Sequence, residues 1–472
     1  MNDDMNSNLS NSTQRKKFII IAFSIFIAAI HIFTYPKLTY SQFAENSLML
    51  KLNNNLNKSN FNTESTASDS AKTTGSYIPG KGLKLVDTDK GSVSFGVFSY
   101  IRYLNQKGLD STYTNSFGKT SSIKRRQDVQ LNKVNIKFFG WIMDPDFRYL
   151  FYVWTSNTSL GQVSQVVVAG NLQYGIDKHI NIGAGINSLP GVFSTSGNFP
   201  YWLPVDNRLI ADEFFRPSYT TGIWANGRIT DNLDYNVMAG NNLSQFGVDA
   251  GQLDNGLRTF SGVINWYPTT GEFGKYSSFG DFDYHKKPAT LLAGHFTYSE
   301  ENKESQPNSD QFENVQLRLS DGSIIFTSDL FGPGITINDA VYKMTCANLG
   351  FKYKGFAFVG EYYWRWLTNF TGLGIDSLGF KEITDNGFQA NASYMILQQK
   401  LQVYATLSQV FGDYGNPWDA RVGFNYYPWK NQAFRMNVEY IQVYRSPVGA
   451  LSLPYPVGGT GGIFNLDFMV NF

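Results

Sequence analysis

The stretch Ile463-Phe464-Asn465-Leu466-Asp467-Phe468-Met469-Val470-Asn471-Phe472 decides which kind of fold this chain adopts. Its apolar residues occupy every second position, and alternate residues of a β-strand point to opposite faces. One face therefore carries Phe464, Leu466, Phe468, Val470 and Phe472. The other carries Asn465, Asp467 and Asn471, with Met469 as its single apolar member. The pattern predicts a strand with one apolar and one polar face, which soluble and membrane β-proteins share.

The end of this strand favours the membrane class. The strand runs to the last residue, the aromatic Phe472. A terminal strand of this kind resembles the closing strand of outer-membrane barrels, which the barrel-assembly machinery of that membrane reads as a signal. The resemblance implies that this machinery and the lipids of the outer membrane are partners of the chain.

Composition favours a wall of strands over a thick apolar core. Of the 472 residues, 16% are aromatic, only 16% are charged and 44 are Gly. One large barrel can take up about 400 residues, because each strand contacts only its neighbours, and aromatic girdles are typical of such walls. The net charge of +1 gives no support for a nucleic-acid partner. One cysteine, Cys346, excludes an internal disulfide framework and a cysteine metal site.

The N-terminus has the features of a secretory signal. Arg15, Lys16 and Lys17 precede an apolar run over residues 18–33, which is short for a spanning helix. The small residues that flank Tyr40 then predict cleavage after Ser41. The alternative is an uncleaved N-terminal anchor.

Three parts of the chain follow. We expect a signal peptide over residues 1–41 and a flexible polar segment, rich in Asn, Ser, Thr and Lys, over residues 42–80. We expect a transmembrane β-barrel domain over residues 81–472. No later stretch is apolar enough for a membrane helix, so a membrane-spanning form of this domain has to be a barrel.

Alternating segments of about ten residues recur from residue 92 onward, and ten residues cross a bilayer when a strand is tilted. These segments are 93–97, 128–140, 147–157, 163–174, 180–188, 217–228, 233–241, 257–267, 288–299, 342–353, 356–367, 386–397, 400–411, 418–427, 433–445 and 462–472. Their number is even, as in bacterial outer-membrane barrels. The predicted fold is therefore an all-β, antiparallel transmembrane barrel of about 16 strands.

The connections between these segments alternate in length. Tight turns are predicted at 143–146, 176–179, 230–232, 353–355, 398–399 and 428–431. Long loops are predicted at 105–127, 189–216, 242–256, 300–341, 368–385 and 446–461. Short turns at one end and long loops at the other are typical of an outer-membrane barrel. The segment 268–287 breaks the rule, since it is long where a short turn is expected.

The polar positions should face the lumen and the apolar positions the lipid. Phe388 and Ala390, for example, alternate with Gln389 and Asn391. Applied throughout, this rule turns more basic than acidic side chains inward. The basic set is Arg102, Lys133, Lys137, Arg148, Arg228, Lys352, Arg365, Arg421 and Arg435, and the acidic set is Asp234, Glu361, Glu439 and Asp467. Rings of Arg and Lys favour anions; the alternative is that these charges solvate the wall or pair with each other.

Several ordered motifs resemble the phosphate-selective porin O and P family. The longest runs from Arg208 to Trp224 (RLIADEFFRPSYTTGIW). Further matching stretches are 267–274, 279–285 and 360–363, with 317–322 as a weaker one. The resemblance covers most of residues 80–472.

The resemblance implies a sixteen-stranded homotrimeric channel whose third outward loop, residues 189–216 here, folds into the lumen and narrows it. It places Tyr201, Arg208, Asp212, Glu213 and Arg216 at or near the constriction. The named phosphate porins use a ladder of inward arginines, which cannot be placed residue by residue here. Two carboxylates stand beside two arginines in this loop, so the loop is not plainly basic, and this departure argues against a simple transfer of phosphate selectivity. The alternative is an ordinary surface loop whose charges pair in solvent.

Motifs for catalysis, cofactors or metals are absent from the sequence. The predicted mature chain holds only His179, His285 and His295, with no serine or aspartate at a spacing that indicates a triad. No phosphate loop, zinc motif or calcium loop occurs. We therefore expect a passive channel for small hydrophilic solutes that is not an enzyme. A barrel hydrolase that uses His295 and a plugged structural or adhesion barrel remain as alternatives.

Overall fold

The computed structural model describes residues 77–78, 82–156, 165–191, 193, 201–244, 256–274, 278–305, 317–449 and 453–472. The expected signal peptide and almost all of the expected flexible segment lie outside the described residues. By contact density the chain divides into units 1–49 and 50–472, and every described residue belongs to the second unit. No helix of the described part is long and apolar enough to cross a membrane.

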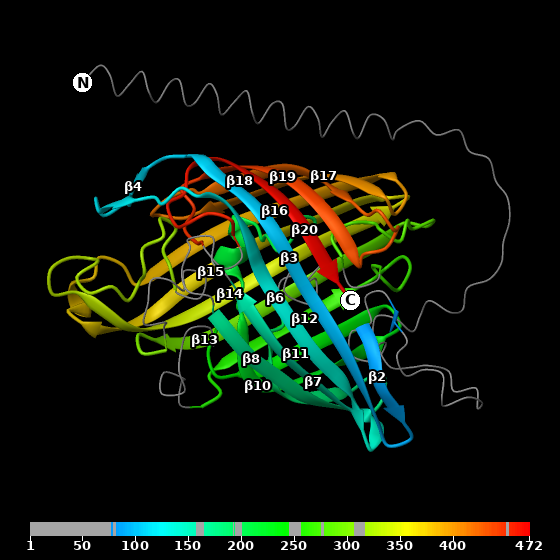
Figure 1. Ribbon diagram of the computed structural model, residues 1–472. Helices are drawn as coiled ribbons and strands as arrows, with labels where there is room; N and C mark the ends of the chain where they lie inside the picture. Colours follow the sequence, from blue (N-terminus) through cyan, green and yellow to red (C-terminus); the bar gives the residue numbers. More distant parts are fainter. Residues whose placement is uncertain are drawn as a thin grey trace. The chain divides into compact units, whose positions relative to one another are not determined.

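Sixteen antiparallel strands of the described chain form a closed barrel (Figure 1). They are β3 (Gly91–Leu109), β6 (Gln127–Ile142), β7 (Asp144–Ser156), β8 (Gln165–Gly175), β9 (Asn181–Ser188), β10 (Tyr219–Thr230), β11 (Leu233–Gly240), β12 (Thr259–Trp266), β13 (Ala289–Asn302), β14 (Thr336–Tyr353), β15 (Phe356–Leu373), β16 (Glu382–Leu397), β17 (Leu401–Phe411), β18 (Trp418–Tyr426), β19 (Phe434–Tyr444) and β20 (Gly461–Asn471). Each strand pairs with its neighbours in the chain, and β20 pairs with β3 to close the barrel. The predicted fold class and strand number are confirmed.

The seam of the barrel lies at the C-terminus. Phe472 and Val97 exchange two backbone hydrogen bonds, of 2.6 and 2.9 Å. On the N-terminal side of Val97, the same edge of β3 pairs with β2 (Gly82–Thr88). β2 also pairs with the short β1 (Tyr77–Ile78). The seam edge of β3 is therefore covered by two strands placed end to end, β20 and then β2.

The two ends of the barrel differ as predicted. The connections after β6, β10 and β14 have one or two residues, whereas the loops after β9, β13 and β19 are long. The connection between β12 and β13, residues 267–288, is long at the short-turn end, which confirms the exception. The loop expected from residue 105 is wrong in its start, because β3 continues to Leu109 by pairing with β20. The loop that follows contains the hairpin of β4 (Thr112–Thr114) and β5 (Thr120–Ser122).

The two faces of the closing strand are sorted as the alternation predicts. Phe464 and Phe468 are 38% and 40% exposed on the outer face, whereas Asn465 and Asp467 are fully buried inside. Met469, the apolar exception, is also inside, where it packs in a cluster with Phe98. An apolar outer face and a polar inner face are the reverse of a soluble barrel.

One sector of the wall departs from this rule. The inner face of β14 is largely apolar, and the inner faces of β13 and β15 carry buried apolar side chains beside polar ones. The apolar ones include Leu291, Tyr342, Met344, Cys346, Val359, Tyr363 and Leu367. The expectation of a polar lumen is wrong for this sector, because segments from both ends of the barrel fold inward and pack against it.

Candidate functional site

The described part of the third outward loop, between β9 and β10, lies inside the barrel. All of residues 201–215 are buried, including the helix α2 (Ile210–Phe215). The loop carries apolar side chains, among them Leu203, Val205 and Phe215, that pack with inner wall residues. The inward-folded third loop is therefore confirmed, and the alternative of an ordinary surface loop is wrong.

The barrel wall caps the helix α2. Its N-cap residue, Leu209, has no side-chain oxygen to accept from the first free backbone N–H groups. Two inner residues of the wall replace it: Asp419 accepts from the backbone N–H of Ile210 at 3.3 Å, and Ser408 accepts from that of Ala211 at 3.2 Å. The wall therefore supplies the hydrogen-bond acceptors that the helix's own N-cap residue lacks.

Arg435 on β19 holds the first part of the loop. Its guanidinium donates to the carbonyl oxygens of Trp202 at 2.7 Å, Leu203 at 3.3 Å and Pro204 at 3.4 Å. Asn425 on β18 donates to the same Leu203 carbonyl at 2.8 Å. These carbonyls follow one another along an irregular segment, so one guanidinium satisfies backbone acceptors that no strand could pair.

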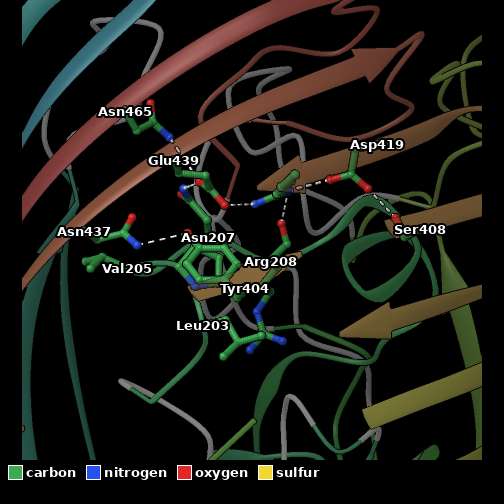
Figure 2. Close-up of polar contacts among 12 residues, drawn as sticks. Leu203, Val205, Asn207, Arg208, Tyr404, Ser408, Asp419, Asn437, Glu439 and Asn465 are labelled. Atoms are coloured by element: carbon green, nitrogen blue, oxygen red, sulfur yellow. Dashed lines mark hydrogen bonds and ion pairs between the residues drawn. The ribbon is translucent and has the colours of Figure 1, made fainter. Parts of the chain in front are cut away.

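Arg102 on β3 holds the next residues from the other side of the seam. It forms a bidentate pair with Asp467, its cross-strand neighbour on β20, at 2.7 and 2.9 Å. The same guanidinium donates to the Val205 carbonyl at 2.6 Å and to the Asn207 side chain at 2.8 Å. Asn207 in turn donates to Glu439 at 2.9 Å. The loop is thereby joined to β3, β19 and β20 at one point. Figure 2 shows the part of this junction formed by Asn207 and Glu439.

Asp206 ties the same turn of the loop to β6. Its carboxylate lies 2.5 Å from Lys133 Nζ and accepts from the Tyr100 hydroxyl at 2.9 Å. A β-bulge between β3 and β6 turns Asn132 and Lys133 inward together, and Asn132 donates to the Tyr100 hydroxyl. The left-handed backbone of Asp206, with φ of 49°, directs its carboxylate to this cluster.

Arg421 on β18 lies under the start of α2 and is 2% exposed. Its Nε and one terminal nitrogen both donate to Oδ2 of Asp419, two residues earlier on the same face, at 2.8 and 2.6 Å. It also donates to the Arg208 carbonyl and, at 3.2 Å, to the Tyr455 hydroxyl, and it lies 3.7 Å from Glu439. Figure 2 shows how Asp419 and Glu439 converge from neighbouring strands on this position.

The charged residues of the loop pair with one another. Arg208 lies 2.9 Å from Asp212 and 3.6 Å from Glu213, and Arg216 lies 2.8 Å from Glu213. Arg365 on β15 stacks over Phe214, with its guanidinium carbon 4.0 Å from the ring centroid.

The remaining predicted site residues lie at other levels of the lumen. Arg365 is also paired with Asp385, its cross-strand partner on β16, at 2.6 Å. Tyr201 accepts from Asn471 at 3.2 Å. Arg148 lies at the short-turn end, 3.1 Å from the half-exposed Asp146. Lys137 faces the lumen from β6, with its Nζ 5.6 Å from the centroid of an inner phenylalanine, Phe139.

Besides Glu301 on β13, two inner carboxylates that pair with arginines were not predicted from the sequence. Asp385 lies one residue before the expected start of its strand, and Asp419 shares the inward face with Arg421. Both are paired with predicted inward arginines. The inner wall of the described chain is therefore less basic than the alternation of polar and apolar positions predicted. Its arginines bind carboxylates and loop carbonyls instead of forming an open ladder. The alternation predicts that Asp419, two positions before the inward Arg421, also faces inward, so Asp419 could have been predicted from the sequence.

The connection 267–288 enters the lumen from the short-turn end. Lys352 on β14 donates to the carbonyls of Phe273 at 2.7 Å and Ser278 at 2.6 Å. Phe279 and Phe273 contact Phe193 of the third loop edge to face, with ring centroids 5.1 and 5.7 Å apart. The two inward segments therefore meet inside the barrel, and together they fill the sector in front of β13–β15.

His285 fixes the far end of this connection. Its ring contacts Asp281 and lies 3.2 Å from Glu272, and the two carboxylates raise the pKa of His285 to about 9 despite its burial. Asp281 also accepts from the backbone N–H of Gly355 at 2.8 Å, in the turn after β14. Hydrogen bonds and the charge of His285 lower the pKa of both carboxylates.

Ser261 and His295 lie together on the inner wall, without a carboxylate beside them among the described residues. Ser261 Oγ lies 3.2 Å from His295 Nε2, but it also contacts Thr297 at 2.6 Å. His295 Nδ1 has no hydrogen-bond partner among the described residues, so no carboxylate orients the ring there. Both side chains are buried. The described residues also contain no group of three side chains that could hold a metal ion.

No family model and no curated protein matches this chain. Among solved structures, an anion-selective porin from Comamonas acidovorans matches with a TM-score of 0.48 at 10% identity, over 81% of this chain and 100% of the porin. The outer-membrane channel DcaP of Acinetobacter baumannii matches with a TM-score of 0.48 at 11% identity, over 83% and 99%. The OmpF of Salmonella typhi, solved in complex with daunomycin, matches with a TM-score of 0.47 at 12% identity, over 83% and 100%. At this level of similarity the matches add nothing to the barrel that the strand pairing already defines.

Proposed function

We propose that this protein is a passive channel for small hydrophilic solutes in the bacterial outer membrane. The observation that carries the proposal is a closed barrel with an apolar outer face, a polar inner face over most of its wall, and a loop held across its lumen by wall side chains. An apolar exterior suits lipid, and a polar interior suits water. The strand that ends on Phe472 closes this barrel and would be the part that the barrel-assembly machinery reads.

The solute path runs along β6 to β9. The third loop is anchored to β3 and to β15–β20, and the connection 267–288 fills the front of β13–β15. On the opposite wall the inner side chains of Asn135, Tyr152 and Gln173 are only half-buried. Amide and hydroxyl groups of this kind can replace part of the hydration shell of a passing solute.

We extend the proposal to a modest preference for anions, phosphate among them. The pairs at Arg102, Arg208, Arg365 and Arg421 remove most of the attraction that unpaired guanidiniums would exert. Lys137 faces the path without a carboxylate within ion-pair distance in the described chain. One such cation in a narrow polar passage raises the local anion concentration.

A homotrimer completes the proposal. β9, β11 and β12 have only eight residues each, against eighteen in β14 and β15. Eight residues extend about 27 Å, and at a tilt of about 45° they cover about 19 Å, less than an apolar band of about 25 Å. The outer surface of this short wall forms an apolar groove of about 940 Å³, whose lining includes Ile223 and Phe260. A neighbouring copy would cover both the short wall and the groove, and cross-linking in membranes tests the number of copies.

Planar-bilayer recording of the purified protein tests the channel. We expect stepwise conductance, and a reversal potential in a KCl gradient that shows a small excess of chloride over potassium current. A folded barrel that inserts without conducting would favour the plugged structural barrel, which the filled sector in front of β13–β15 makes the second candidate. A cation-selective channel would contradict the anion preference but not the channel.

A further inference from the structure

Positive charge at the long-loop end of the barrel gathers in the first outward loop, between β3 and β6. Residues 105–127 contain a single acidic residue, Asp110, and five basic ones, Lys107, Lys119, Lys124, Arg125 and Arg126. The other long loops have no net positive charge, and in the loop over residues 300–341 acidic residues outnumber basic ones. An anionic partner at this end of the barrel would therefore meet its attraction at the first outward loop.

The two chains at the base of this loop lie side by side. Gln106 donates its backbone N–H to the Arg126 carbonyl at 2.8 Å, and Ile123 donates its backbone N–H to the Ser111 carbonyl at 2.8 Å. Three exposed cations lie between these two bonds, namely Lys107, Lys124 and Arg125.

Two of these cations belong to the outer face of the wall. Gln106 and Leu109 are buried on the inner side, so Lys107 between them points outward. Arg125 lies two positions before the exposed Gln127 of β6 and shares its face. The guanidinium of Arg125 donates to the Leu109 carbonyl at 3.2 Å, which lays this side chain across the end of β3.

The two cations lack an acidic partner within the described chain. Arg126, on the inner side, is paired with Asp128. No ion pair among the described residues involves Lys107 or Arg125, and Asp110 does not come within ion-pair distance of either. Like charges on neighbouring strands repel each other, so an anion bound between these two would remove an unfavourable contact.

The outer face of β3 below Lys107 has the order of a membrane boundary. Its outward positions from Val93 to Tyr103 are apolar or aromatic, apart from Ser99. Ten residues extend about 34 Å, and at a tilt of about 45° they cover about 24 Å, close to an apolar band of about 25 Å. The Tyr103 ring meets Phe464 of β20 edge to face, with ring centroids 6.4 Å apart, and Phe464 is the cross-strand partner of Tyr440. Such a row of outward aromatic rings marks the edge of the hydrocarbon region.

The two cations lie just above this aromatic row. Lys107 follows Tyr103 by four residues, which is about 14 Å along the strand and about 10 Å in height. The polar headgroup layer of a bilayer is about 5–8 Å thick on each side, and Lys and Arg side chains bend back toward it along their stems. The charged groups of Lys107 and Arg125 therefore reach the level at which lipid phosphates lie.

We propose that Lys107 and Arg125, with Lys124 beside them, bind the phosphate groups of an anionic lipid in the outer leaflet. The guanidinium offers a planar pair of donors to a phosphate, and the ammonium adds a second charge. The acyl chains of the same lipid would lie on the wall below, where Ile101, Val129 and Leu131 are 47%, 67% and 54% exposed. The inference rests on the outer-membrane location of the barrel and not on conduction.

Titration of the detergent-solubilised barrel with lipid A that carries two phosphates tests the site, with native mass spectrometry as the readout. We expect Lys107→Gln/Arg125→Gln to weaken lipid A binding about 30-fold, because each cation near an anionic lipid surface contributes a factor of about five. Equal binding by the wild type and this double variant would overturn the proposal. Heat-modifiable migration on gels shows whether each variant has folded, so a failed fold is not read as lost binding.

A matched control removes the same charge from the other end of the barrel. Lys354 and Lys430 are exposed in two turns at the short-turn end, so Lys354→Gln/Lys430→Gln should bind lipid A as the wild type does. A loss as large as that of Lys107→Gln/Arg125→Gln would show that total charge governs binding, and it would overturn the site.

Two further measurements identify the occupant. Dephosphorylated lipid A should bind the wild type and Lys107→Gln/Arg125→Gln equally, and inorganic phosphate at the concentration of lipid A should not displace it, because free phosphate lacks the acyl chains. Displacement by inorganic phosphate would overturn a lipid as the occupant. Cross-linking of Arg125→Cys between copies of the chain in membranes would show that a second copy covers the patch, which would also overturn it.

Discussion

Replacement of Arg435 by Met should release the first part of the third loop and widen the channel. Arg435 is 3% exposed and donates to the carbonyls of Trp202, Leu203 and Pro204. Met has a similar length and apolar stem but no donor. Because the acceptors are carbonyls of the loop, the substitution removes a loop anchor without leaving a buried carboxylate unpaired, as it would at Arg421.

The magnitude follows from the geometry of these bonds. The bond to Trp202 has good length, at 2.7 Å, whereas those to Leu203 and Pro204 are long, at 3.3 and 3.4 Å. A hydrogen bond to a charged group contributes about 1.5–3 kcal/mol, and the long bonds add a fraction of that. Asn425 still donates to Leu203, so we expect a loss of about 2–4 kcal/mol. Such a loss raises the detached population of the loop roughly 30- to 1000-fold.

Cysteine labelling and conductance measure this loosening. Leu203 is 2% exposed, so Leu203→Cys should react slowly with a water-soluble thiol reagent in the otherwise wild-type barrel. Adding Arg435→Met should speed this reaction roughly 30-fold or more, and the single-channel conductance of Arg435→Met should rise.

The companion variant Arg435→Lys separates charge from geometry. Lys keeps the positive charge but lacks the planar fork that reaches three carbonyls, so an intermediate labelling rate is expected. If Arg435→Met labels at the wild-type rate and conducts as before, the arginine does not hold the loop and the reasoning about wall anchors is refuted.

Three further predictions concern other parts of the barrel. The pKa of His285 is raised to about 9, so the stability that its pairs with Asp281 and Glu272 contribute is fully present below about pH 6.5 and is lost as pH rises through about 9. Thermal melting should therefore show that His285→Gln costs about 1–2 kcal/mol at pH 6, after discounting for solvent screening, and almost nothing at pH 10. An equal cost at both pH values would contradict this. Cys346 is 3% exposed on the filled side of the lumen, so a thiol reagent should modify it only after unfolding, and rapid labelling of the native protein would show that the inward segments do not cover β14. A Cβ at Gly227 would overlap the backbone carbonyl of His179, in the turn between β8 and β9, so Gly227→Val should shift the register of β10 and lower the yield of heat-modifiable barrel, with wild-type yield as the refuting result.

The architecture was readable from the chain because a membrane barrel repeats one rule. Lipid outside and water inside impose the same alternation on each strand, so Phe464 and Asn465 already show which face is which. The lengths of the connections were equally visible, including the exception at 267–288. Strand ends were less certain, since β3 extends to Leu109 through pairing that local alternation does not show.

The inner charges show where this rule stops. Arg102 and Arg421 were correctly placed inside, but their alternation says nothing about what they bind. Asp467 faces Arg102 because β20 closes onto β3, about 365 residues away in the chain. Of the two expectations for these inward charges, anion attraction and pairing with each other, the structure shows pairing at Arg102 and Arg421, and the partners come from other strand positions and from the loop.

The sequence by itself determined the strand number, the two faces of the wall and the sidedness of the loops, since these depend on local alternation and on the constant thickness of a membrane. Only the tertiary structure decided that the third loop and the connection 267–288 meet inside the barrel and fill the sector in front of β13–β15. Their positions depend on carbonyls and carboxylates that find donors such as Arg435 and Lys352 across the lumen. Buried polar groups need hydrogen-bond partners that lie near them in space. Which residues come close across a closed barrel cannot be predicted from any local sequence pattern.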